Sequence, residues 1–172
     1  MITIPLNKNT CALVVSICLL LWHGDALCQS AHYAGPSTYV ASTPCSAGTR
    51  PLPGIPKDAS CELIKWKLIL SGSGQSPATG TYSLDCHYGM PKQGTRDFIN
   101  GGTHLQRTGK WITRIGMYGN PAAVIYQLDP DTASVSISFI RINDNLLHLL
   151  DNKQHLMIGT GAWSYTLSKI KP

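Results

Sequence analysis

Apolar and polar residues alternate along most of the chain beyond residue 60, and this period of two is typical of β-strands with one buried face. The clearest case is the segment 78–90, which lies between two breaks that contain glycine. Within it, Tyr82, Leu84, Cys86 and Tyr88 fall on one face, while polar residues fall on the other. The segment is therefore predicted to be one half-buried strand.

The same alternation recurs further along the chain, and turn-forming residues separate the apolar runs roughly every ten residues. No helix of normal length and no internal repeat is predicted. About eight or nine strands joined by short turns favour an all-β fold, an antiparallel up-and-down meander that forms a small closed or partly open barrel. Besides 78–90, the predicted strands are 63–70, 103–107, 110–115, 122–128, 135–141, 146–150, 154–158 and 163–169.

Aromatic side chains are expected to point into this barrel from several strands. A barrel of about eight strands is just wide enough to be filled by side chains or to hold one small ligand. The pattern leaves both arrangements open. The aromatic residues predicted to face inward are Trp66, Tyr82, Trp111, Phe139, Trp163 and Tyr165.

Residues 1–28 have the pattern of a secretory signal peptide. An apolar run at 12–22 follows a short polar start that contains Lys8. This run is short for a bilayer span, but it suits the apolar region of an export signal. Small residues permit cleavage before Leu27 or before Gln29, and lipidation of Cys28 is a further alternative. We expect a periplasmic, cell-envelope or secreted protein, attached to a membrane only if Cys28 is lipidated.

Residues 29–60 differ in composition from the rest of the chain. They are rich in Pro, Ser, Thr, Gly and Ala, and five prolines interrupt regular structure. We expect an extended arm here, and the alternative is an ordered loop that packs along the sheet. The barrel domain is then predicted to span residues 61–172.

Composition and charge narrow the classes of function. Only 13% of the residues are charged and Glu62 is the single glutamate, which agrees with an all-β chain. The formal net charge is +5, but the basic residues are scattered from Arg50 to Lys171. Nucleic-acid binding favours a basic run or an aromatic platform, and the sequence has neither. We therefore expect a mildly basic surface and no nucleic-acid partner.

Export changes how the cysteines are interpreted. The mature chain keeps Cys45, Cys61 and Cys86, together with Cys28 if the leader is cut before it. A structural disulfide is the usual state in an oxidising compartment. Three cysteines leave one unpaired and four permit three pairings, so the sequence alone does not name the bridge. We prefer Cys45 with Cys61 because they flank the Pro-rich segment, and closing that loop would contribute about 3 kcal/mol.

The densest cluster of candidate metal ligands is Cys86, His87 and Met90. Thiolate, imidazole and thioether are the soft ligands that copper prefers. Neighbouring residues of a strand point to opposite faces, so Cys86 and His87 would share one ion only across a bulge. The alternative places Cys86 in the core or in a disulfide and His87 towards solvent. A joint site of His87, His104 and Met90 at the barrel mouth is a further arrangement.

No catalytic motif is present. The chain contains no Gly-x-Ser-x-Gly elbow, no His-Glu-x-x-His and no phosphate-binding glycine motif. Asp129 and Asp131 lie on either side of a proline in a predicted turn, where bonding to nearby amides explains them. We therefore predict that the protein is not an enzyme.

Several short motifs, taken together, resemble a known family. They are 80–84 with its Gly-Thr-Tyr, 109–111 with its Gly-Lys-Trp, 124–128, 146–151 with its Leu-Asp turn, and 163–167. In order and approximate spacing they resemble the N-terminal domain of the NlpE-like copper-resistance lipoproteins of Gram-negative envelopes, over about residues 48–169. The resemblance implies a lipocalin-like β-barrel in the periplasm or on an outer membrane. It also implies roles in copper tolerance, envelope-stress signalling or surface sensing.

Two functions of different classes follow from these observations. The first is a non-enzymatic binding or sensing module in envelope homeostasis that takes a small apolar ligand or a copper ion. The second is a structural or protein-interaction module with a barrel filled by side chains and no ligand. In that case the Gly-rich loop 89–102 and the Pro-rich arm would contact an envelope protein partner.

Overall fold

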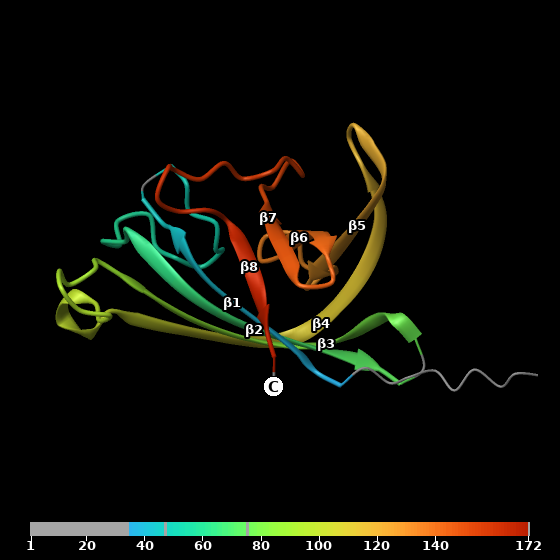
Figure 1. Ribbon diagram of the computed structural model, residues 1–172, viewed down its shortest axis with the longest axis horizontal. Helices are drawn as coiled ribbons and strands as arrows, with labels where there is room; N and C mark the ends of the chain where they lie inside the picture. The colour runs from blue at the N-terminus through green and yellow to red at the C-terminus, as the bar shows by residue number, and fades with distance from the viewer. Residues whose placement is uncertain (1–34, 47, 75, 172) are drawn as a thin grey trace, which may run out of the picture. The chain divides into compact units, whose positions relative to one another are not determined.

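The computed structural model describes residues 35–46, 48–74 and 76–171, and these residues form an eight-stranded closed barrel (Figure 1). Each strand pairs antiparallel with the next along the chain, and β8 pairs with β1 to close the wall. The predicted all-β up-and-down meander is therefore confirmed as a lipocalin-like closed barrel. Its elements are β1 (Ser37–Pro44), β2 (Leu63–Ser73), β3 (Ser76–Gly89), the short 3-10 helix η1 (Ile99–Gly101), β4 (Thr103–Met117), β5 (Asn120–Leu128), β6 (Ile137–Asn143), β7 (Leu146–Leu150) and β8 (Thr166–Ile170).

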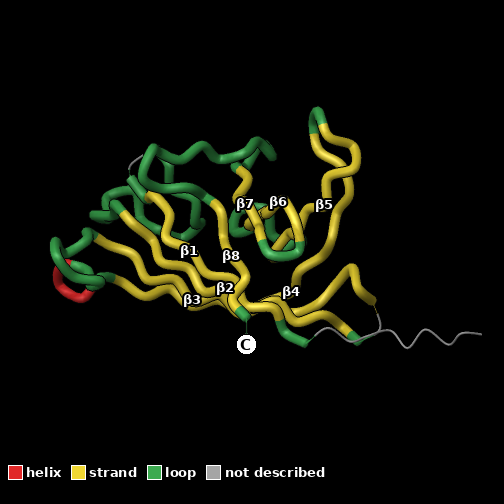
Figure 2. Tube along the Cα trace, viewed as in Figure 1, coloured by secondary structure: helices red, strands yellow, loops and turns green. Residues whose placement is uncertain are grey.

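The strands differ greatly in length. Figure 2 shows β2, β3 and β4 as long strands that run next to one another, whereas β6, β7 and β8 are short. Leu84 of β3 lies opposite Leu68 of β2 and Arg107 of β4, which fixes the register of this long section. The alternation predicted for 78–90 is observed in β3, where Tyr82, Leu84 and Cys86 are buried.

Side chains fill the interior of the barrel. Trp66 donates a hydrogen bond from its indole Nε1 to Thr43 Oγ1 at 2.8 Å, and its ring meets Phe139 edge-on at 6.4 Å between centroids. A buried Trp therefore has both apolar contact and a partner for its N–H. All eight strands contribute to this core, through Tyr39, Ile64, Trp66, Leu68, Leu70, Tyr82, Leu84, Cys86, Tyr88, Trp111, Leu128, Ile137, Phe139, Leu147, Leu149 and Leu167.

The barrel begins earlier than the boundary predicted at residue 61. Ser37–Pro44 lie inside the segment expected to be an arm, yet they form β1. Tyr39 and Thr43 are buried on the inner face of this strand, so the period of two was present among the prolines. Pro36 precedes the strand and Pro44 ends it, where a missing N–H interrupts no ladder. The expected signal peptide, residues 1–28, lies outside the described residues.

The predicted Cys45–Cys61 disulfide is confirmed. The two Cα atoms lie 5.4 Å apart, and the bridge joins the end of β1 to the residues just before β2. Between them, the β1–β2 connection (45–62) folds over the core rather than extending as an arm. Leu52 is 2% exposed and Ile55 is 8% exposed, and both belong to the core cluster. For this part of the segment, the alternative of an ordered packed loop is the observed one.

Three details near the C-terminal half differ from the expectations. Residues 103–117 form one strand, with no break at Gly109. Residues 154–158 were expected to be a strand, but they make only an isolated bridge between Leu150 and Leu156. Trp163 was expected to face inward, but it is 45% exposed because β8 begins only at Thr166. The turn in which Thr160 N donates to Trp163 O holds this tryptophan in the connection.

Among residues 35–46, 48–74 and 76–171 there is no helix with the length and apolar character that a membrane span requires.

Candidate functional site

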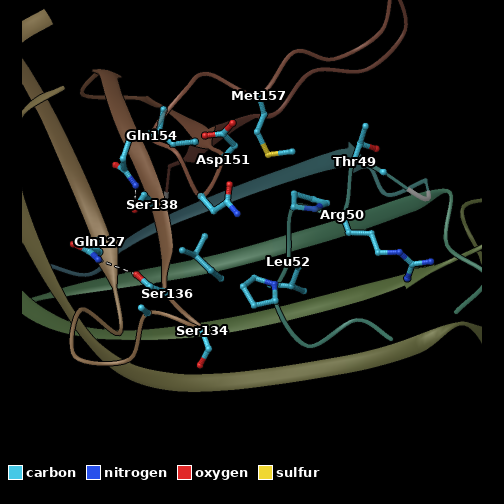
Figure 3. A pocket seen from close by; sticks show the side chains of 17 residues that line it. Thr49, Arg50, Leu52, Gln127, Ser134, Ser136, Ser138, Asp151, Gln154 and Met157 are labelled. Carbon is cyan, nitrogen blue, oxygen red and sulfur yellow. Dashed lines mark hydrogen bonds between the residues drawn. The ribbon is translucent and has the colours of Figure 1, made fainter. Parts of the chain in front are cut away.

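The path of the chain gathers four connections at one end of the barrel, because successive strands of a meander run in opposite directions. These connections are 45–62, 90–102, 129–136 and 151–165. Three of them surround a cleft of about 700 Å³ (Figure 3), which we call the mouth cleft. Its lining comes from Gly48, Thr49, Arg50, Pro51, Leu52, Pro53, Gln127, Ala133, Ser134, Ser136, Ile137, Ser138, Leu150, Asp151, Asn152, Gln154 and Met157.

One wall of the mouth cleft is a row of hydroxyl and amide side chains. Gln127 Nε2 donates to Ser136 Oγ at 3.0 Å, and Ser136 Oγ donates in turn to Leu128 O at 2.9 Å. Gln154 Nε2 donates to Ser138 Oγ at 3.2 Å. Figure 3 shows these groups on one side of the cleft and Thr49, Arg50 and Leu52 across from them. The bonds hold the polar groups in place before any molecule binds.

Residues of the hydrophobic core form the floor of the mouth cleft. Leu52 and Ile137 are 2% and 3% exposed, and both line the cleft. Met157 also lines the cleft and packs against the core, and its backbone oxygen is 2.9 Å from Nε2 of His148. The other ring nitrogen of His148 is 2.9 Å from Thr166 Oγ1. The cleft therefore combines an apolar floor with a polar wall, a composition typical of small-molecule sites.

The charged groups at the rim already have partners. Arg50 donates to the carbonyl oxygens of Lys57 and Ala59, each at 2.8 Å. Asp151 Oδ1 accepts hydrogen bonds from the amides of Lys153 and His155, also at 2.8 Å. Desolvation acts to raise the pKa of Asp151, but these amides and the His155 imidazole outweigh it and lower the pKa. The rim is therefore better suited to an uncharged molecule than to an ion.

A network inside the barrel fixes the wall formed by 129–136. Tyr82 Oη donates to Asp129 Oδ2 at 2.5 Å, and Arg107 Nη2 donates to the same oxygen at 2.6 Å. Arg107 Nη2 also donates to Val135 O at 2.8 Å. Burial and the bond to Asp129 raise the pKa of Tyr82 to about 12, so its hydroxyl remains a donor at neutral pH. The network anchors the β5–β6 connection to β3 and β4.

The structure does not bring the three candidate copper ligands together. Cys86 faces the interior opposite Trp66 and is fully buried, whereas His87 lies on the outer side of β3. Met90 is 38% exposed at the start of the β3–β4 connection. Burial raises the pKa of the Cys86 thiol, which keeps it protonated at neutral pH. Within the described part of the chain, no cluster of three or more His, Cys, Asp or Glu is placed to hold a metal ion.

His87 instead has a histidine neighbour, one of the residues in the predicted joint arrangement of His87, His104 and Met90. His104 lies opposite it on β4, and the two rings stack with centroids 3.9 Å apart. His87 Nε2 is also 2.6 Å from Gly101 O, and its ring meets Phe98 edge-on. This pair therefore fastens the β3–β4 connection to the outer side of the barrel. The register of β3 against β4 was the missing information, because alternation alone does not specify it.

Sequence reasoning also missed the polar wall of the mouth cleft. Ser136 and Ser138 alternate with Ile137 and Phe139, and this alternation by itself indicates only outward-facing positions on a strand. Gln127 and Gln154 carried no motif. The signal in the sequence is a serine at every second position from Ser134 to Ser138, a run that begins in the β5–β6 connection and continues into β6.

Comparisons of this chain with models of protein families, with curated proteins and with solved structures found no match. The resemblance to the NlpE-like proteins therefore stays a prediction.

Proposed function

We propose that the protein is a non-enzymatic binding module of the cell envelope and that the mouth cleft is its ligand site. The observation that carries this proposal is a cleft of about 700 Å³ placed directly above an interior filled by side chains. This volume is within the range of about 300–1,000 Å³ that is usual for small-molecule sites. A ligand would thus sit at the mouth rather than inside the barrel.

The chemistry of the lining supports a small uncharged ligand with several hydrogen-bonding groups. In the described structure, the Ser138 hydroxyl accepts from Gln154 and donates to no protein acceptor, so its proton is available to a ligand. Leu52, Ile137 and Met157 would contact the apolar side of the same molecule. Arg50 and Asp151 are engaged with the backbone, so they offer little to a charged ligand.

Export to the envelope is part of the same proposal. The Cys45–Cys61 disulfide supports it, because such bonds persist mainly in oxidising compartments. The apolar run 12–22 and the resemblance to NlpE-like barrels support it independently. The intact mass of the exported protein, measured before and after reduction, would report the cleavage site, any lipid on Cys28 and the disulfide.

Calorimetric titration with a panel of neutral molecules tests the ligand site. The panel contains glucose, N-acetylglucosamine and N-acetylalanine amide, with their charged analogues as a comparison. We expect at least one neutral molecule of the panel to bind. Gln154→Leu and Ser138→Ala should each weaken its binding about tenfold, because each substitution removes a hydrogen bond and leaves a polar group unpaired, at a cost of about 1–3 kcal/mol. The matched control is Gln106→Leu, an exposed glutamine on β4 that does not line the cleft.

Two results would remove the mouth cleft as the ligand site. The first is an absence of binding by every neutral molecule of the panel. The second is binding that Gln154→Leu and Ser138→Ala leave unchanged while both variants keep the unfolding midpoint of the parent protein. Copper remains a prediction of the sequence, and titration with Cu(I) and Cu(II) in the same instrument would test it.

A filled interior also favours the second function, an interaction module without a ligand. Removal of the Pro-rich segment 29–60 would not test this function, because that segment contains β1 of the barrel wall. The sharper variant replaces the exposed charges Lys92, Arg96 and Asp97 of the β3–β4 connection by glutamine or asparagine. Loss of capture of an envelope protein by this variant, with stability unchanged, would support the interaction module.

A further inference from the structure

A second cavity lies on the outer side of the barrel, away from the mouth cleft. It has a volume of about 440 Å³ and is enclosed by the β3–β4 connection, the outer sides of β1 and β2, and one residue of the β7–β8 connection. We call it the outer pocket. Its lining residues are Ser42, Leu63, Lys65, Pro91, Lys92, Gln93, Gly94, Thr95, Arg96, Asp97, Phe98 and Trp163.

The walls of the outer pocket are mainly apolar. Leu63 and Phe98 are only 8% and 3% exposed, although both lie outside the barrel core. Trp163 is the exposed large apolar side chain of the lining, with 45% of its surface accessible. A molecule bound in this cavity would bury part of the exposed indole surface, and the burial of apolar surface favours binding.

The outer pocket is held open by contacts that need no ligand. The rings of His87 and Phe98 pack edge to face, with their centroids 4.6 Å apart. The Lys65 ammonium lies 5.0 Å from the centroid of the Phe98 ring. The β3–β4 connection is closed on itself by a bridge between Pro91 and Phe98, and by Ile99 N donating to Met90 O at 2.8 Å. A cavity that is already formed loses little conformational freedom on binding.

The charges around the outer pocket are mostly positive. Lys65, Lys92 and Arg96 line it, and Asp97 is the one carboxylate among the lining residues. Lys65 also donates to the backbone oxygen of Arg96, which keeps its ammonium at the pocket. Lys92 and Arg96 are exposed, so their side chains are free to turn towards a ligand at the entrance. An anionic group at this entrance would therefore be favoured over a neutral or cationic one.

We propose that the outer pocket binds an amphiphilic organic anion, such as an aliphatic carboxylate. Its hydrocarbon chain lies against Leu63, Phe98 and Trp163, and its carboxylate is held by Lys92 and Arg96. This site is independent of the mouth cleft, because the two share no lining residue. Failure of one proposal therefore leaves the other standing.

Three probes with the same hydrocarbon chain test the charge preference, namely octanoate, 1-octanol and octylammonium. We expect octanoate to bind at least about tenfold more tightly than 1-octanol in calorimetric titrations, and octylammonium to bind most weakly. Octanoate should also shift the tryptophan emission to shorter wavelength, because Trp163 is exposed while Trp66 and Trp111 are buried. No binding of octanoate, or equal binding of all three probes, would overturn the proposal.

Two variants separate the charged and apolar parts of the site. The double variant Lys92→Gln/Arg96→Gln should weaken the binding of octanoate about tenfold and leave that of 1-octanol unchanged, since it removes two charge-assisted hydrogen bonds that solvent at the entrance screens. Trp163→Ala should weaken the binding of both octanoate and 1-octanol. Trp163→Phe should bind both more tightly than Trp163→Ala does, but it should show no emission shift.

The matched control for charge is Lys67→Gln, because Lys67 is an exposed lysine on the same side of β2 that does not line the pocket. It should leave octanoate binding unchanged. If Lys67→Gln weakens the binding of octanoate as much as the double variant does, the basic surface as a whole attracts the anion. The outer pocket is then excluded as its binding site. Urea unfolding of each variant shows whether the fold is kept.

Discussion

Arg107 is a charged residue on the inner face of a barrel whose other inward positions are mainly apolar. It lies opposite Leu84, and Asp129 and Val135 O take its hydrogen bonds. Its Nη1 atom is buried without a protein partner among the described residues. A buried charge is tolerated when it is paired, and here the pairing also fixes the loop that forms one wall of the mouth cleft. The position of this wall therefore depends on a few side chains.

Gly109 is the residue that makes room for this network. A Cβ atom at this position would collide with Asp129 Oδ1 and would come within 2.9 Å of Tyr82 Cε1. We expect Gly109→Ala to lower the free energy of unfolding by about 1–3 kcal/mol, as overpacking of a core usually does. Urea denaturation measures it. The control is Gly161→Ala, where a Cβ meets nothing within 4 Å, and equal stability of the two variants would contradict this account of Gly109.

Tyr82 should make stability depend on pH in the alkaline range. Its pKa is raised to about 12 in the folded protein, against 10.0 for an ordinary tyrosine. The contribution of Tyr82 is therefore complete below about pH 10 and is lost as the pH rises through about 12, because only the unfolded chain releases the proton easily. The urea midpoint should fall less in Tyr82→Phe than in the parent protein between about pH 9 and about pH 11.5. An equal fall in both proteins would count against the network.

At the scale of elements, the β1–β2 connection covers the core at one end of the barrel. Leu52 and Ile55 from this connection join the core, and the connection also lines the mouth cleft. Its two ends are joined by the Cys45–Cys61 bridge and by Cys45 N donating to Glu62 O at 3.0 Å. This proline-rich segment is therefore an ordered connection that packs on the core, because its ends are fixed and its apolar residues are buried.

Reduction of the Cys45–Cys61 bridge should therefore destabilise the whole barrel. The sequence separation is 16 residues, and a loop of about this size corresponds to about 3 kcal/mol in the chain-entropy model. We expect a reducing agent to lower the free energy of unfolding of the parent protein by about this amount. It should have no effect on Cys45→Ala/Cys61→Ala. A parent protein that is equally stable with and without the reducing agent would contradict this prediction.

The elements show which parts of the fold could be predicted from sequence. Strands with clear alternation, such as 78–90, were placed correctly because burial of one face imposes a period of two. Strand β1 was missed because Ser, Thr and Pro dominate its surroundings, although Tyr39 and Thr43 alternate inward. Trp163 was misplaced because the β7–β8 connection turns before β8 starts, and hydrogen bonds such as Thr160 N to Trp163 O decide that turn.

At the scale of the molecule, the closed wall could be predicted but the position of the candidate site could not. A chain of consecutive antiparallel strands predicts a barrel, and this prediction does not require the register of each strand pair. The mouth cleft instead depends on three connections that are far apart in sequence, and its polar wall brings Gln154 of the β7–β8 connection next to Ser138 of β6, which pairs with Gln127 of β5. No local pattern encodes such a meeting. The candidate metal ligands Cys86 and His87 are neighbours in sequence, but they lie on opposite faces of β3 because successive side chains of a strand point to opposite sides.

Because side chains fill the interior, a ligand is expected to bind at the mouth cleft and not inside the barrel. Nuclear magnetic resonance of the backbone amides, recorded while the tightest neutral molecule of the panel is added, tests this most directly. We predict that the signals of Gln127, Ser138 and Gln154 shift with one common affinity while those of Trp66 and Leu84 stay in place. Shifts that are largest at Trp66 and Leu84 would place the ligand inside the barrel and would contradict the account.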